Sequence, residues 1–165
     1  MAKTSSGYSL AQILLHWAIA ALIVFQYAGH EAIVEFVELV GITAASSGEV
    51  PTMARAHVLV GILIGALMVI RVILRFVSGT PALPKEETPM MKLLAHATHF
   101  TLYAALFLMP MSGMAAWFGQ VETALVAHNV LKIVLLAFVA LHVAAALYHQ
   151  LILKNHLIKR MMKPE

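Results

Sequence analysis

The chain has 165 residues, a mass of 17.9 kDa and no cysteine, and it is 61% hydrophobic but only 12% charged. A soluble domain usually carries about twice that charged fraction, so the composition excludes an ordinary soluble enzyme. The lack of cysteine excludes disulfides, thiolate zinc sites, iron–sulfur clusters, thioether-linked haem and a cysteine nucleophile. The net charge of +3 would suggest nucleic acid in a soluble protein. In a chain this apolar the charges belong to membrane orientation, and we expect no nucleic-acid partner.

Four apolar stretches are each long enough to cross a bilayer. They cover about residues 10–29, 54–77, 91–118 and 123–153. We therefore expect an all-α fold, a four-helix transmembrane bundle with up-and-down topology, formed by residues 1–165 as a single domain. The first stretch follows a single lysine and precedes no cleavage-site pattern, so we expect an uncleaved helix.

The segments between the helices also carry signals. Residues 30–53 form an acidic loop, in which Ile33–Val40 is a candidate for a short helix at the membrane interface. Pro110 and Gly113 lie inside the third stretch and predict a kink there.

The distribution of lysine and arginine predicts the orientation. Nine of these residues fall on the side that holds both termini, and two fall on the other side. The positive-inside rule therefore predicts that both termini are cytoplasmic. The nine are Lys3, Arg71, Arg75, Lys85, Lys92, Lys154, Lys159, Arg160 and Lys163; the two are Arg55 and Lys132.

Four histidines fall at matching depths of the predicted helices. His128 and His142 are 14 residues apart on the fourth helix, so they share one face at a separation of about 21 Å. A polar side chain in hydrocarbon needs a partner, and imidazole is a standard axial ligand of haem iron. Matching by depth pairs His57 with His128 and His16 with His142. The pattern predicts two haem sites stacked across the membrane.

Other interpretations of these histidines stay open. His30 also lies 14 residues after His16 and competes with His57. Gly61 and Gly65 favour His57, because they follow it at i+4 and i+8 and would offer a flat macrocycle a smooth surface. The histidines could instead bond helix to helix. A zinc site is disfavoured, because ligands about 21 Å apart cannot share one ion.

Several short sequence pieces form a recognisable set, and they occur in this order along nearly the whole chain: Tyr8-Ser9…Gln12…His16-Trp17, His57-Val58…Gly61, Arg71…Arg75, His96…His99, Pro110…Gly113, His128, Leu141-His142…Ala145-Ala146…His149 and Arg160-Met161-Met162. Together they resemble the bacterial cytochrome b561 family, which includes superoxide oxidases. The resemblance implies a four-helix bundle with two haem b groups, ligated by His16 and His142 and by His57 and His128. It also implies electron exchange with ubiquinone and, for superoxide oxidases, electrons taken from superoxide at the outer face. The chain departs from the family pattern at Leu14 and in its acidic first loop.

The remaining charged residues are assigned by position. Arg71 lies 14 residues after His57 at the depth of the inner haem, and Arg75 lies one turn further. We expect both to pair with haem propionates; the alternative is a snorkelling anchor. Arg55 and Lys132 are the outer cations, and we expect them to pair with outer propionates or to guide superoxide.

Three further histidines lie near the cytoplasmic level. His149 follows His142 by seven residues on the same face, and His96 and His99 begin the third helix. Quinone reduction consumes protons, which histidine can deliver near neutral pH. We expect these residues to bind or protonate ubiquinone.

The leading hypothesis is a superoxide:ubiquinone oxidoreductase, a multi-pass protein of the bacterial inner membrane. Superoxide would supply electrons at the periplasmic face, and ubiquinone would accept them within the lipid. The first alternative is an electron-transfer subunit that links a partner dehydrogenase to the quinone pool. The second is a non-redox four-helix membrane protein.

Overall fold

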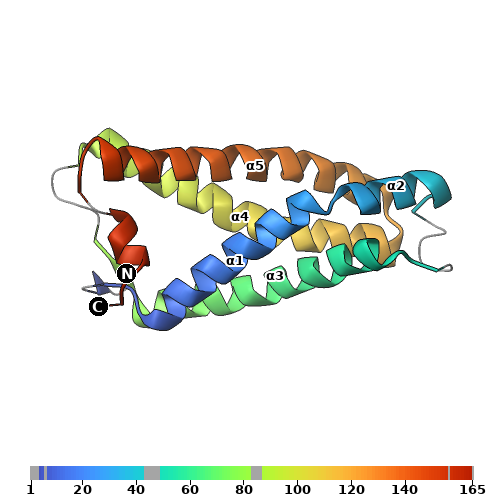
Figure 1. Ribbon diagram of the computed structural model, residues 1–165, viewed down its shortest axis with the longest axis horizontal. Helices are drawn as coiled ribbons and strands as arrows, with labels where there is room; N and C mark the ends of the chain where they lie inside the picture. The colour runs from blue at the N-terminus through green and yellow to red at the C-terminus, as the bar shows by residue number, and fades with distance from the viewer. Residues whose placement is uncertain (1–3, 6, 43–48, 83–86, 156, 165) are drawn as a thin grey trace.

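The computed structural model describes residues 4–5, 7–42, 49–82, 87–155 and 157–164. Its long helices run side by side along the molecule (Figure 1). They are α1 (Leu10–Ala28), α3 (Thr52–Ser78), α4 (Pro89–Gly119) and α5 (Glu122–Leu151). The shorter elements are β1 (Thr4–Ser5), α2 (Glu31–Val40), β2 (Thr80–Pro81) and the 3₁₀ helix η1 (Leu157–Met161).

All four long helices are long and apolar enough to cross a membrane. Only 6% to 17% of the most apolar window of each helix is buried inside the protein. An apolar surface this extensive is typical of a face covered by lipid. The predicted all-α bundle with four spans is confirmed, and the interfacial helix expected at Ile33–Val40 is α2.

The start of α1 is fixed by its own side chains. Ser9 and Gln12 form a capping box, in which each side chain accepts a bond from the other's backbone N–H. The Gln12 amide also donates to the Gly79 carbonyl at 2.9 Å. Gln12 therefore both begins α1 and ties it to the end of α3.

Gly65 of α3 packs against Pro110 of α4. A Cβ atom at this position would lie 3.2 Å from the Pro110 Cβ, so only glycine lets the proline ring settle against α3. Gly65 therefore serves helix packing here, and the smooth surface that it was expected to offer a macrocycle stays a prediction. The helix α4 continues through both Pro110 and Gly113.

The helix α5 packs on only part of the bundle. In the described part of the chain it packs extensively only on α4 and η1, whereas α1 packs on α3 and α3 on α4. Figure 1 shows α5 and α3 along opposite edges of the bundle. The backbone of α5 therefore makes no extensive contact with α1 or α3 in the described part of the chain.

The two ends of the bundle differ. Both chain termini, β1, β2 and η1 lie at one end, here called the terminal end, and α2 lies at the other, here called the α2 end (Figure 1). The terminal end is the side on which the sequence places nine cations, of which Lys3 and Lys85 lie outside the described residues. That this end is cytoplasmic stays a prediction.

We predict that Gly65→Leu lowers the free energy of unfolding by about 1–3 kcal/mol, because the new side chain overpacks the contact with Pro110. Thermal unfolding in detergent measures the effect. Ala66→Leu is the control, because Ala66 is exposed on the same helix. Equal melting temperatures for the two variants would contradict the packing role of Gly65.

Candidate functional site

One pair of histidines lies toward the α2 end. The imidazole rings of His57 on α3 and His128 on α5 have centroids 6.3 Å apart, with planes at 69°. His128 Nδ1 donates to the Met109 carbonyl at 3.0 Å and lies 3.2 Å from the Ser112 hydroxyl. These contacts orient the ring and leave its Nε2 available. His57 Nδ1 is buried with no hydrogen-bond partner among the described residues.

A cavity of about 360 Å³ opens beside this pair. Its volume is within the range of about 300–1,000 Å³ that is typical of small-molecule pockets. Both histidines line it, and its walls are mostly apolar. The polar and charged side chains of its lining, besides His57 and His128, are Gln26, Tyr27, His30, Glu38, Asn129 and Lys132.

Two glycines keep the space around the pair open. A Cβ at Gly113 would lie 3.1 Å from His128 Cε1, so glycine lets the imidazole lie against α4. Gly61 lines the cavity, as the sequence predicts, and a Cβ there would lie 3.3 Å from the Gln26 amide nitrogen. Gln26 donates to the His57 carbonyl at 3.0 Å, which links α1 to α3 at this level.

The second pair lies toward the terminal end. His16 on α1 and His142 on α5 have ring centroids 6.3 Å apart, with planes at 72°. The ring of His99 on α4 lies 5.2 Å from that of His142. Arg71 on α3 donates to His16 Nδ1 at 3.2 Å and reaches the Gln12 carbonyl at 3.4 Å. Every long helix thus contributes a polar side chain at this level.

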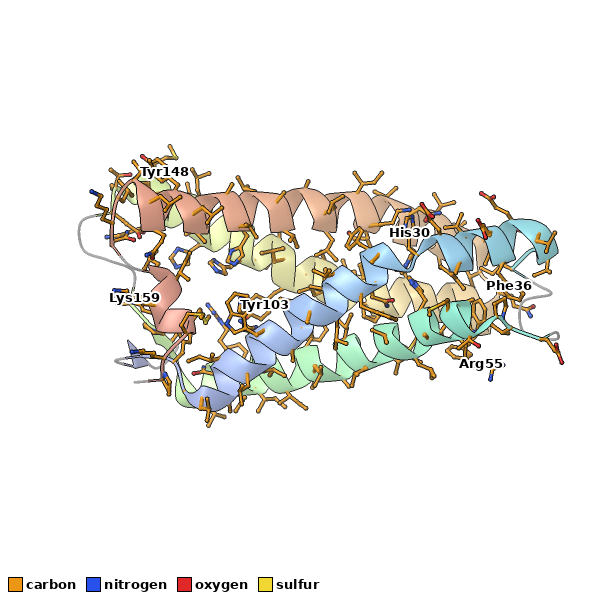
Figure 2. All side chains as sticks on the ribbon, in the orientation of Figure 1. His30, Phe36, Arg55, Tyr103, Tyr148 and Lys159 are labelled. Carbon is orange, nitrogen blue, oxygen red and sulfur yellow. The ribbon has the colours of Figure 1, made fainter. Side chains whose placement is uncertain are left out.

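Cations and phenols surround this second pair. The Arg75 guanidinium stacks on the Tyr103 ring at 5.4 Å, and Figure 2 shows Tyr103 in the half of the bundle nearer the terminal end. Tyr8, just before α1, lies near both arginines. Burial raises the pKa of its hydroxyl above the ordinary value, against the opposing effect of the Arg75 charge. Tyr8 is therefore a neutral hydrogen-bonding group beside two fixed positive charges.

The two pairs have the same spacing. Two imidazoles that bind one metal ion from opposite sides, each through a bond of about 2 Å, hold their ring centres about 6 Å apart. Within the described residues, no cluster of three or more histidine, aspartate or glutamate side chains is placed to hold a metal ion. The geometry suits two separate sites with two imidazoles each, and it does not suit a zinc site with three protein ligands.

The cations predicted for the outer side differ in placement. Lys132 lines the cavity beside His128. Arg55 is exposed, does not line this cavity and donates to the Val50 carbonyl at 3.4 Å. Figure 2 shows Arg55 pointing away from the bundle. His30 lines the cavity, with its Nδ1 bonded to the Tyr27 carbonyl at 3.1 Å, while His57 holds the position opposite His128.

The three histidines predicted near the terminal end differ in their contacts. His96 is exposed, and its Nδ1 donates to the Lys92 carbonyl at 2.6 Å. His99 donates in the same way to the Ala95 carbonyl at 2.7 Å, but its ring reaches His142. His149 lies 2.7 Å from the Asn155 amide and 3.6 Å from the Glu87 carboxylate.

Several contacts of these sites were not expected from the sequence. Glu87 beside His149 had one signal, its place as a carboxylate on the cation-rich side. Ser112 and the Met109 carbonyl, which hold His128, lie within one turn of α4 around Pro110. Backbone carbonyls leave no trace in a residue pattern, so this second contact could not be read from the sequence.

Comparison with known proteins agrees with this geometry. The model of the family described as prokaryotic cytochrome b561 matches residues 7–164. Cytochrome b562 of Cereibacter sphaeroides is 35% identical, over 96% of each chain. A probable superoxide oxidase, CybB of Yersinia pestis, is 27% identical over 94% of this chain and 95% of that protein. The chain therefore belongs to the prokaryotic cytochrome b561 family, and it is a multi-pass bacterial membrane protein of a family that binds haem b and transfers electrons.

Proposed function

We propose that the chain binds two haem b groups, one between His57 and His128 and one between His16 and His142. The observation that carries this proposal is the repetition of one geometry, because both pairs have ring centroids 6.3 Å apart. The two pairs share α5, on which His128 and His142 are separated by about 21 Å. When bound, haem iron supplies one-electron chemistry at each level of the bundle.

The residues around the His57–His128 pair, here called the outer pair, fit a haem group. His57 has a buried ring nitrogen without a partner among the described residues, and His128 is held through Nδ1 so that its Nε2 is available. A ligand histidine that donates its other ring nitrogen to a carbonyl is a common arrangement at metal sites. The neighbouring cavity is mostly apolar, Gly61 lines it, and Gly113 gives the His128 ring room against α4.

The residues around the His16–His142 pair, here called the inner pair, fit a haem group as well. A haem carries two propionates, and Arg71 and Arg75 are the cations nearest the pair. Arg71 touches His16, and a guanidinium has five N–H donors, so donors remain for a carboxylate. Arg75 is held by Tyr103 and serves as a second positive charge.

We predict that His57→Ala lowers the haem content to about half of the wild-type value, because one of two ligand pairs is broken. His30→Ala keeps the full content, because His30 lines the cavity without facing His128. Extraction of haem as a pyridine complex measures the ratio per chain. The reverse ranking of the two variants would assign the ligand role to His30.

Gly113→Val provides a separate test of the outer site. The added side chain collides with His128, so we predict loss of haem from this site and retention of the other. Ala115→Val, at an exposed position on the same helix, is the matched control. Spectra of the two reduced proteins measure the loss, and full haem content in Gly113→Val would contradict the geometry.

We further propose that the protein moves electrons from superoxide at the α2 end to ubiquinone near the terminal end, in the bacterial inner membrane. The similarity to a probable superoxide oxidase supports this choice of donor. Lys132 lines the outer cavity and would attract a small anion through its charge. The exposed Arg55 would act only at longer range. Each ligand pair occupies two coordination positions, which favours electron transfer without binding of oxygen at iron.

The terminal end supplies the groups that a quinone requires. Reduction of a quinone to a quinol takes up protons, and histidine is suited to deliver them near neutral pH. His149 lies seven residues beyond His142 and His99 touches the His142 ring. These two are the proposed quinone-binding and proton-donating residues, and His96, one turn before His99 on α4, is the third candidate.

The test is turnover of the purified protein with superoxide and a soluble ubiquinone. We predict that superoxide is consumed faster than by spontaneous decay, with oxygen released and quinol formed at one quinol for two superoxide ions. Lys132→Gln should slow the reaction with superoxide, and the slowing should shrink as salt is added, because the attraction is electrostatic.

A haem-loaded protein that passes electrons to quinone but does not react with superoxide would contradict the proposed donor. That outcome would favour the electron-transfer subunit for a partner dehydrogenase. The exposed carboxylates of α2, Glu31, Glu35 and Glu38, would then be the first surface to test for docking.

A further inference from the structure

Glu87 is a buried carboxylate without adequate partners. Its side chain is only 3% exposed, and neither carboxylate oxygen has a hydrogen-bond partner among the described residues. Burial of an unpaired carboxylate is costly, so such a group usually marks a function or a ligand. Glu87 comes two residues before α4 begins at Pro89, so it lies just outside the spanning segment.

The one titratable neighbour of Glu87 among the described contacts is His149. His149 Nδ1 lies 3.6 Å from Glu87 Oε1, and the His149 side chain is 14% exposed. The side-chain nitrogen of Asn155, Nδ2, lies 2.7 Å from the same ring nitrogen. Asn155 reaches back because Lys154 has φ 54°, which reverses the chain after α5. The loop after α5 and the segment before α4 thus meet at one histidine.

This cluster has an excess of hydrogen-bond acceptors. Asn155 Oδ1 and Gln150 Oε1 are also buried without partners in the described part of the chain. Such acceptors are satisfied by groups that donate, as water and protonated groups do. Glu87 precedes α4, His149 and Gln150 lie in the last turn of α5, and Asn155 follows that helix, so the cluster lies at the terminal end of the bundle. A polar path can therefore begin at this point.

The path leads toward the inner pair. His149 follows His142 by seven residues on α5, so both side chains share one face about 10 Å apart along the axis. In the proposed function a quinone head group binds at the level between these two side chains. A proton held at His149 is then within reach of the acceptor.

We propose that Glu87 is the proton-uptake residue of this protein and acts through His149; this inference rests on the proposed function. Glu87 takes a proton from water at the terminal end and passes it to His149 Nδ1. The imidazole releases its other proton from Nε2 to the reduced quinone. Two superoxide ions supply two electrons and become oxygen, two protons arrive by this route, and the quinone becomes quinol.

The test compares two electron acceptors. Quinone takes up protons with its electrons, whereas ferricyanide takes up electrons alone. We predict that Glu87→Gln slows oxidation of the reduced protein by a soluble quinone at least about tenfold, within the range of general acid catalysis. Its oxidation by ferricyanide and its haem content stay at wild-type values. Glu122→Gln, an exposed carboxylate at the start of α5, is the matched control and keeps both rates.

A double substitution tests whether Glu87 acts through His149. If Glu87 acts through His149, Glu87→Gln adds no further slowing to His149→Gln. Equal slowing with both acceptors would overturn the proposal, because it would reveal a structural role, and so would an unchanged quinone rate. A wild-type protein that reduces ferricyanide but no quinone would instead overturn the proposed function itself.

Discussion

An imidazole placed within a lipid-facing bundle has to be partnered, and the architecture follows from that constraint. A polar group without a partner is expensive in hydrocarbon, yet His16, His57, His128 and His142 all lie within spanning helices. They resolve into two pairs of equal spacing on the inner faces of the bundle. Each pair joins α5 to the opposite side of the bundle. Where direct helix packing is sparse, the histidine pairs bring side chains of α5 close to those of α1 and α3.

The contacts around the pairs position the rings. His128 is held by the Met109 carbonyl and is given room by Gly113. His16 is held by Arg71, which is itself bonded to the first turn of α1. The bundle brings α3 and α4 together at Gly65 and Pro110, while α5 packs extensively on α4 and η1. Glycine therefore allows close contact between helices at Gly65 and beside a histidine ring at Gly113.

The sequence predicted the fold well, because its signals are strong and local. Long apolar runs fix four spans, and the helices begin and end within two residues of the expected bounds. The spacing of His128 and His142 also predicted their common face, since a helix repeats regularly. The contact of Gly65 with Pro110 was not predicted, because Pro110 comes from another helix. A residue pattern gives the face of a helix but does not identify the neighbour that covers it.

The polar cluster of Glu87, His149 and Asn155 was harder to predict for the same reason. These three residues come from segments that are separate in sequence and meet only after α4 and α5 have packed. Arg55 illustrates the converse. Its charge and position near His57 suggested the outer site, but the side chain is exposed. Charge counts locate a side of the membrane, and tertiary structure decides which cations reach a site.

The most direct test of this account is the number of haem groups per chain in the gently purified wild-type protein, with its reduced-minus-oxidised visible spectrum. The two histidine pairs predict two b-type haems per chain, both low-spin, because each iron has two imidazole ligands. A single haem per chain in membranes never exposed to harsh detergent would contradict the account. One of the two pairs would then be a structural contact between helices.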